Sequence, residues 1–170
     1  QAMPINISNW NVEDNKFWES TGKKIATKNL WISIPALLLA FAVWIMWSVI
    51  ATKMKEFGYN FGMIDSGMSP EEVTEKLKEI NSLYYTLPAI AGLAGATLRI
   101  PNSFLIGIGG GRNVIFTCTA LLLIPAIGVV FALQDVNTPY MNFAILAALS
   151  GFGGGNFSSS MSNISYFFPK

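Results

Sequence analysis

The sequence predicts an all-α membrane protein with four transmembrane helices, and three observations favour this fold class. Hydrophobic residues make up 52% of the 170 residues and charged residues only 12%, about half of the roughly 25% that is usual in soluble domains. Four apolar stretches are each long enough to cross a bilayer, which takes about 20 residues of helix. Polar segments that contain glycine, proline or charged residues separate these stretches.

The first part of the chain predicts a polar segment, a span and a long loop. Residues 1–28 carry aromatic and lysine side chains that suit a short interfacial helix, and a disordered tail is an equally good interpretation. Residues 29–51 are uncharged and have tryptophans near both ends, which is typical of a spanning helix. Residues 52–81 form a polar loop, in which Ser69 before Pro70 predicts the start of a short surface helix.

Three further spans are predicted at residues 82–108, 113–134 and 138–168. The second span of the chain carries small residues four positions apart, a spacing that lets another helix approach closely in lipid. The third contains Pro125, and the fourth is uncharged and contains a glycine run at 153–155.

Arg99 lies well inside the second predicted span and is the first candidate site residue. An ionisable group at membrane depth costs between about 3 and more than 10 kcal/mol, so such groups are rare and usually functional. Pro101 follows two residues later and tends to kink the helix, because it cannot donate a backbone hydrogen bond. A cation beside such a turn predicts a binding site for a small anion. The alternative is an arginine that snorkels to the headgroups and binds lipid.

A polar stripe on the fourth predicted span is the second candidate. Asn156, Ser160 and Asn163 follow one another at i, i+4 and i+7 and therefore share one helix face. Such side chains either hydrogen-bond to neighbouring helices or face a ligand. At about 1.5 Å per residue, Arg99 and Phe157 both lie about 15 Å from the same side of the membrane. A guanidinium, an aromatic ring and polar groups at one depth suit a small planar oxyanion.

The residue types that the sequence lacks narrow the function further. There is no histidine, and the single cysteine, Cys118, lies in an apolar run, so we expect no metal site and no cofactor. We expect no enzyme activity either, because no nucleophile–base pair is present. Basic residues do not alternate with aromatics in a patch, so we expect no nucleic-acid partner. No Asp, Glu, His or Lys lies inside any predicted span, so the usual proton-relay residues are absent from these spans.

The basic residues beside the spans predict the orientation of the chain. With a cytoplasmic N-terminus, six Lys/Arg lie on the cytoplasmic side and four on the other side. Because cytoplasmic loops carry the excess of basic residues, we expect the N-terminus in the cytoplasm and the loop of residues 52–81 in the periplasm.

A resemblance to a known family rests on five stretches: NLWISIPALLLAFAVW, LPAIAGLAGATLRIPNSF, GGGRNVIF, QDVNTPY and GFGGGNFSSSMSNISYFFPK. They are similar to the N-terminal third of nitrate/nitrite porters in the major facilitator superfamily, and especially to the NarK-type nitrate/nitrite antiporters. The resemblance implies that the chain is an N-terminal fragment, with four helices of the N-terminal bundle of a twelve-helix transporter. It also implies exchange of nitrate and nitrite by alternating access across the bacterial inner membrane.

The resemblance further implies roles for three residues. Arg99 occupies the position of the arginine that binds the anion in this family, Phe157 matches a phenylalanine that packs on the flat face of the anion, and Gly154 falls where a small residue lines the path. The expected substrate-binding residues are therefore Arg99, Gly154, Asn156, Phe157, Ser160 and Asn163. The expected partners are nitrate, nitrite, the lipid bilayer and the remaining helices of the same transporter. The alternative, which belongs to a different functional class, is a four-span subunit that anchors or assembles a larger complex.

Overall fold

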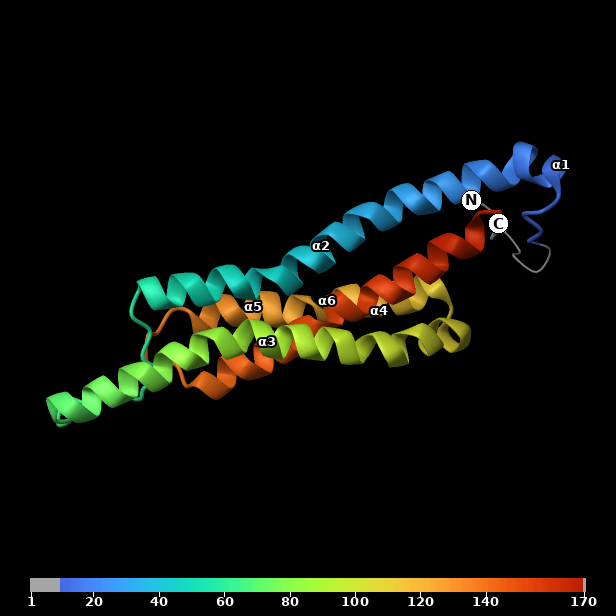
Figure 1. The fold of residues 1–170 in the computed structure, drawn as a ribbon. Coiled ribbons are helices and arrows are strands. Elements are labelled where there is room, and N and C mark those ends of the chain that lie inside the picture. Colours follow the sequence, from blue (N-terminus) through green and yellow to red (C-terminus); the bar gives the residue numbers. More distant parts are fainter. Residues whose placement is uncertain (1–9, 170) are drawn as a thin grey trace.

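The structure of the chain is a computed structural model that describes residues 10–169. These residues form helices and no strands: α1 (Asn15–Phe17), the π-helical turn η2 (Trp18–Gly22), α2 (Lys23–Glu56), α3 (Pro70–Gly109), α4 (Gly111–Leu121), α5 (Leu123–Ala132) and α6 (Tyr140–Phe167). Figure 1 shows an elongated bundle in which α2, α3, the α4–α5 pair and α6 run lengthwise. The predicted all-helical fold is confirmed over these residues.

Three helical stretches are long and apolar enough to cross a membrane: Asn15–Glu56, Pro70–Gly109 and Gly111–Ala132. Helix α6 is not among them, so the four predicted spans are not confirmed. The reason lies in the second half of α6, which is rich in glycine, serine and asparagine. Many of these residues, from Ser150 to Ser160, are buried, because α6 packs against α2, α3, α4 and α5. A helix face that packs against other helices does not need to be apolar, because it does not meet lipid.

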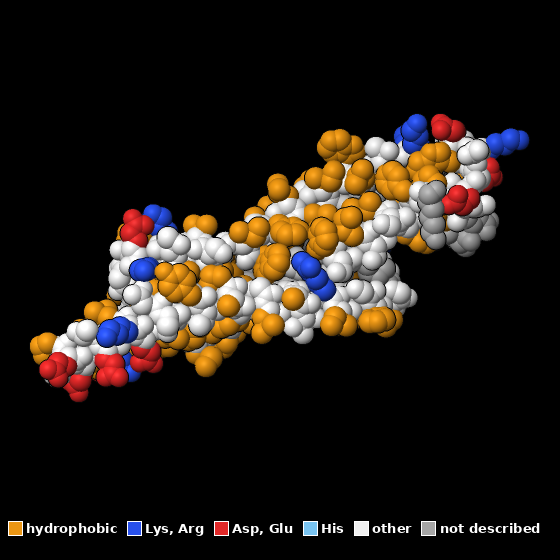
Figure 2. Space-filling view, in the orientation of Figure 1, with side chains coloured by type: hydrophobic (Ala, Val, Ile, Leu, Met, Phe, Trp, Pro, Cys, Tyr) orange, Lys and Arg blue, Asp and Glu red, His pale blue; other side chains and the backbone are white. Residues whose placement is uncertain are grey.

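Charged side chains gather at the two ends of the bundle, as Figure 2 shows. Hydrophobic side chains are spread over the surface between those ends, and one basic side chain lies among them near the middle of this face. Large apolar side chains such as Leu38, Leu93, Phe116 and Ile127 are more than half exposed. This distribution is the one expected of helices that lie in lipid or pack against further helices.

Helix α2 is longer at both ends than the predicted span at residues 29–51, and Pro35 lies inside it. The segment before it folds onto the end of α6: the Trp10 ring centroid lies 5.2 Å from that of Phe17 and 5.1 Å from that of Phe167. Residues 1–9 of the predicted interfacial segment lie outside the described residues. Its placement against headgroups stays a prediction.

The predicted surface helix begins where expected but is not separate from the second predicted span. The Glu72 backbone N–H donates to Ser69 Oγ at 3.3 Å, and the Ser69 N–H donates to Glu72 Oε2 at 2.8 Å, which is a capping box. Hydrogen bonding to Ser69 lowers the pKa of the Glu72 carboxyl. The bond to the Ser69 backbone has the largest effect, and the bond to its side chain has a smaller one. The helix then continues as α3, because buried side chains recur at helical spacing through Ile80, Tyr84 and Leu87.

The third predicted span is interrupted at Leu122, between α4 and α5. Pro125 explains the interruption, because it has no N–H to donate to the carbonyl of Leu121. The backbone hydrogen bond there joins residues three apart instead of four, since the Leu122 N–H donates to the Thr119 carbonyl at 3.2 Å. The two short helices continue along the same side of α6 (Figure 1).

Glycines let α6 lie in direct contact with the backbones of α2 and α3. A Cβ atom at Gly151 would lie 2.6 Å from Ala94 Cβ, and one at Gly153 would lie 2.4 Å from the Ala40 carbonyl oxygen. Such distances leave no room for a side chain. The close packing that small residues predict is therefore present, and it brings α2, α3 and α6 together at the level of Arg99.

Candidate anion site

Arg99 on α3 lies where α2, α3 and α6 meet, and three contacts hold its guanidinium. Its Nε–H donates to the Gly154 carbonyl oxygen at 3.3 Å. Its Cζ lies 5.8 Å from the centroid of the Phe157 ring and 5.8 Å from that of the Trp44 ring. Both distances are within the roughly 6 Å over which a cation and an aromatic face attract each other. The structure thus brings together three of the residues that the sequence singles out: Arg99, Gly154 and Phe157.

Trp44 on α2 belongs to this site, although the sequence suggests only that it marks the end of a span. Its indole Nε1–H donates to the Ala91 carbonyl oxygen of α3 at 2.8 Å. Phe41 packs edge-on against both Trp44 and Phe157, with centroid distances of 5.6 and 5.5 Å. The three rings form a continuous aromatic group beside the guanidinium. The spacing of Phe41 and Trp44, three residues apart on one helix face, is the signal that could have identified them.

Two glycines make the space that the indole ring occupies. A Cβ atom at Gly95 would lie 2.8 Å from Trp44 Nε1, and one at Gly154 would lie 3.0 Å from Trp44 Cε2. Gly154 therefore contributes in two ways: its carbonyl accepts from Arg99, and its lack of a side chain admits Trp44. This contact differs from the lining of an anion path that the resemblance implies.

The polar stripe on α6 makes its contacts away from the guanidinium. Asn156 is fully buried, and its Nδ2 donates to Thr119 Oγ1 of α4 at 3.3 Å. Ser160 is also fully buried, and its Oγ has no partner among the described residues. Asn163 Nδ2 donates to Asn29 Oδ1 at the start of α2 at 3.4 Å. The hydrogen bonds of Asn156 and Asn163 join helices, whereas Asn156 Oδ1 and Ser160 Oγ have no partner among the described residues, so the role of the stripe in substrate binding stays a prediction.

Asn102 of α3 is a buried polar residue that sequence reasoning missed. Its side chain is 1% exposed, Cys118 Sγ lies 3.9 Å from its Oδ1, and Ser159 Oγ donates to its carbonyl oxygen at 3.4 Å. Gly155 makes room for it, since a Cβ there would lie 2.7 Å from Asn102 Nδ2. The contacts of Asn102 and Asn156 together link α3, α4 and α6 one turn beyond Arg99.

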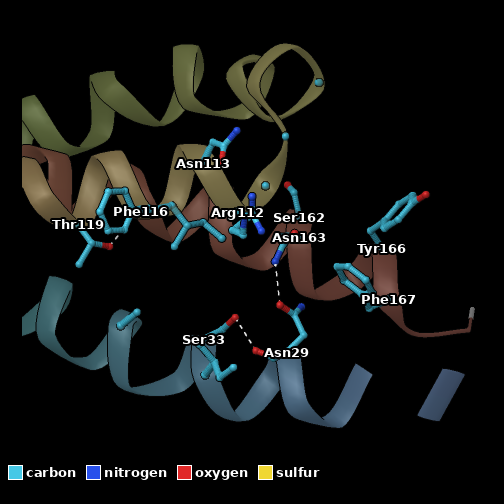
Figure 3. Close-up of a pocket in the computed structure, with 16 residues that line it drawn as sticks. Asn29, Ser33, Arg112, Asn113, Phe116, Thr119, Ser162, Asn163, Tyr166 and Phe167 are labelled. Carbon is cyan, nitrogen blue, oxygen red and sulfur yellow. Dashed lines mark hydrogen bonds between the residues drawn. The ribbon is translucent and has the colours of Figure 1, made fainter. Parts of the chain in front are cut away.

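A separate cavity of about 920 Å³ lies between α2, α4 and the end of α6. Figure 3 shows Asn29 and Ser33 of α2 on one side and Arg112, Phe116 and Asn163 on the other. None of Arg99, Trp44 and Phe157 lines this cavity. It is mostly apolar and is distinct from the place where the guanidinium is held.

The guanidinium of Arg99 keeps its positive charge unpaired within the described part of the chain. The three ion pairs found there all join exposed lysine and glutamate side chains that lie outside the spans predicted from the sequence. Of the five N–H donors of Arg99, the Nε–H is used by Gly154, and the terminal nitrogens remain for another acceptor. Fold and site together define a helical protein with membrane-length helices and a candidate anion site between them.

Comparison with known proteins identifies its relatives. The chain is 42% identical over 164 residues to the nitrate/nitrite transporter NarU of Escherichia coli strain K12 and 38% identical over 164 residues to the probable nitrate/nitrite antiporter NarK2 of Thermus thermophilus. Both matches cover 96% of this chain and 32% of the relative. Over 82 residues it is also 37% identical to the probable nitrate transporter NarT of Staphylococcus aureus strain Newman. No protein-family model matches the sequence.

The resemblance to the N-terminal third of nitrate/nitrite porters is thereby confirmed. The chain spans about a third of the length of the curated relatives NarU and NarK2. Each of the three relatives is named as a transporter or antiporter rather than as an enzyme.

Proposed function

We propose that this chain is the N-terminal part of a transporter that exchanges nitrate and nitrite by alternating access across the bacterial inner membrane. The observation that carries the proposal is the guanidinium of Arg99, held at the meeting point of three helices by Gly154, Trp44 and Phe157. The names of the relatives, nitrate/nitrite transporter and antiporter, support the choice of anions. An anchoring subunit would not need an unpaired cation among apolar helices.

In this proposal Arg99 binds the anion through its terminal N–H groups. A planar oxyanion can accept two parallel N–H bonds from one guanidinium, a geometry that arginine offers and lysine does not. The ring of Phe157, 5.8 Å from the Arg99 Cζ, packs on the flat face of the anion. Gly154 holds the guanidinium through its carbonyl. Asn156 and Asn163 support the site indirectly, because their hydrogen bonds hold α6 against α4 and α2. The buried Ser160 Oγ, which has no partner among the described residues, remains a candidate contact of the substrate.

The four spans, α2, α3, α4–α5 and α6, form part of an N-terminal bundle in this proposal. α6 crosses the membrane as the fourth span because the other helices shield its polar half from lipid. The remaining helices of the transporter, together with lipid, cover the exposed apolar side chains. Transport by alternating access requires a second bundle that moves against the first around the site.

The exchange mechanism gives the first expected result. Arg99 is a permanent cation, and no titratable residue lies beside it within the described spans, so charge balance is met by exchanging one monovalent anion for another. We expect the full-length protein in vesicles to take up labelled nitrate only when nitrite or nitrate is trapped inside, since a cation at membrane depth without a bound anion is unfavourable in low dielectric. If vesicles without internal anion accumulate nitrate when the outside is acidified, proton coupling is the mechanism and exchange is wrong.

The proposed topology gives a second expected result. The loop between α2 and α3 faces the periplasm when the N-terminus is cytoplasmic. A Ser66→Cys variant of the full-length protein should react with a membrane-impermeant thiol reagent in intact spheroplasts. The native Cys118 is buried and serves as the unreactive background. Labelling that appears only after the membrane is opened would reverse the orientation.

A further inference from the structure

The indole of Trp44 is fixed in place independently of Arg99. Its Nε1–H donates to the Ala91 carbonyl at 2.8 Å, and its ring fills the space left by Gly95 and Gly154. Phe41 packs against its edge with a centroid distance of 5.6 Å. The ring therefore has a fixed position before any anion binds.

The guanidinium of Arg99 depends on this ring for its own position. Trp44 lies 5.8 Å from the Arg99 Cζ, and the carbonyl that accepts from Arg99 Nε belongs to Gly154, which is itself packed on the Trp44 ring. Tryptophan offers the strongest aromatic face for a cation. Two of the three contacts that orient Arg99 thus involve Trp44, directly or through Gly154.

An aromatic face is suited to this task because it carries no net charge. A carboxylate would also orient a guanidinium, but it would neutralise the charge and occupy the N–H fork that an anion needs. Aromatic rings hold the cation and leave its charge and its terminal donors to the anion. Within the described residues, no ion pair involves Arg99.

We propose that Trp44 is a positioning residue for anion binding: it holds the Arg99 guanidinium so that the terminal N–H groups face the anion. The inference rests on the proposed function and extends it to a residue of α2. It makes α2 a determinant of anion affinity and of selectivity for planar oxyanions, since a guanidinium that turns freely favours no particular anion shape.

The test uses the purified full-length protein and four variants, Trp44→Phe, Trp44→Leu, Trp47→Phe and Trp47→Leu. Trp47 is a matched control: it lies on the same helix, is fully buried and packs in the core formed with Leu87 and Phe143 rather than against Arg99. The measurements are the nitrate dissociation constant, the KM and kcat of nitrate exchange, the ratio of nitrate to chloride affinity, and the melting temperature.

We expect Trp44→Leu to raise the nitrate dissociation constant and KM on the order of tenfold, with a smaller change in kcat and a lower nitrate-to-chloride ratio. Trp44→Phe should retain part of the affinity, because it keeps a ring but loses the bond to Ala91. The Trp47 variants should lower the melting temperature and leave the dissociation constant and the ratio unchanged.

Two results would overturn the inference while leaving nitrate transport standing. One is an unchanged nitrate affinity in Trp44→Leu, and the other is an equal loss of affinity in the Trp44 and Trp47 variants, which would mean a general structural effect. A wild-type protein that binds neither nitrate nor nitrite would instead overturn the proposed function, and the inference with it.

Discussion

Replacing Arg99 by lysine is expected to reduce nitrate uptake by the full-length protein at least about tenfold, although the positive charge is kept. Charge-assisted hydrogen bonds contribute about 1.5–3 kcal/mol each, and about 1.4 kcal/mol corresponds to a factor of ten. Lysine cannot supply two parallel N–H donors, and its ammonium lacks the flat face that packs between Trp44 and Phe157. Uptake of labelled nitrate into vesicles measures the loss.

Arg112→Lys is the matched control for this experiment. Arg112 is exposed at the start of α4, and it lies outside the group formed by Arg99, Trp44 and Phe157. The control should transport nitrate at a rate close to that of the wild type. If Arg99→Lys is equally active, Arg99 is a lipid-binding or packing residue and the proposed site is wrong.

The second large effect is expected from Gly153→Ala, which should lower the stability of the full-length protein by about 1–3 kcal/mol, the usual cost of forcing extra atoms into a packed interior. The added Cβ would lie 2.4 Å from the Ala40 carbonyl oxygen, and a backbone atom cannot move away as a flexible side chain can. α6 must therefore separate from α2. Because Gly154 is the next residue, the displacement also disturbs the contact with Arg99. The melting temperature and the nitrate dissociation constant should both change.

Gly92→Ala provides the comparison for this variant. Gly92 lies on α3, in the same bundle, and a Cβ atom there would meet nothing within 4 Å. Its melting temperature should not fall, since alanine is a better helix former than glycine. Equal melting temperatures for Gly92→Ala and Gly153→Ala would show that α2 and α6 are not packed as closely as described.

The sequence predicts the residues at the centre of the site because a charge inside an apolar helix is a strong signal. Counting residues from the helix ends places Arg99 and Phe157 at the same depth, and the structure has their groups 5.8 Å apart. Depth alone does not specify which side of a helix faces which neighbour. Asn156 shares the depth of the site, but its side chain contacts Thr119 of α4.

Trp44 was missed for a related reason. Tryptophan near the end of an apolar stretch is typical of a residue at the membrane interface, and that interpretation is usually sufficient. The actual helix is longer than the apolar stretch, since α2 extends to Glu56, so Trp44 lies well inside it. The glycines that admit its ring, Gly95 and Gly154, belong to other helices. A single sequence gives no information on such pairings.

Helix boundaries were predictable only where a local signal decides them. The hydrogen bonds between Ser69 and Glu72 begin α3 at the predicted residue. No cap ends a helix at residue 81, where the surface helix and the span were divided. Pro88, the nearest residue that usually breaks a helix, lies inside α3. Pro125 was noted in the sequence, but whether a proline kinks or interrupts a helix depends on its surroundings.

A density map of the full-length protein with nitrate, compared with a nitrate-free map, tests the central claim most directly. The claim is that Arg99, oriented by aromatic rings, binds the anion. The expected result is a difference peak within about 2.7–3.2 Å of the terminal nitrogens of Arg99, with the anion flat against Phe157 and the guanidinium still beside Trp44. A nitrate peak elsewhere, with Arg99 bound to a lipid headgroup or a carboxylate, would contradict it.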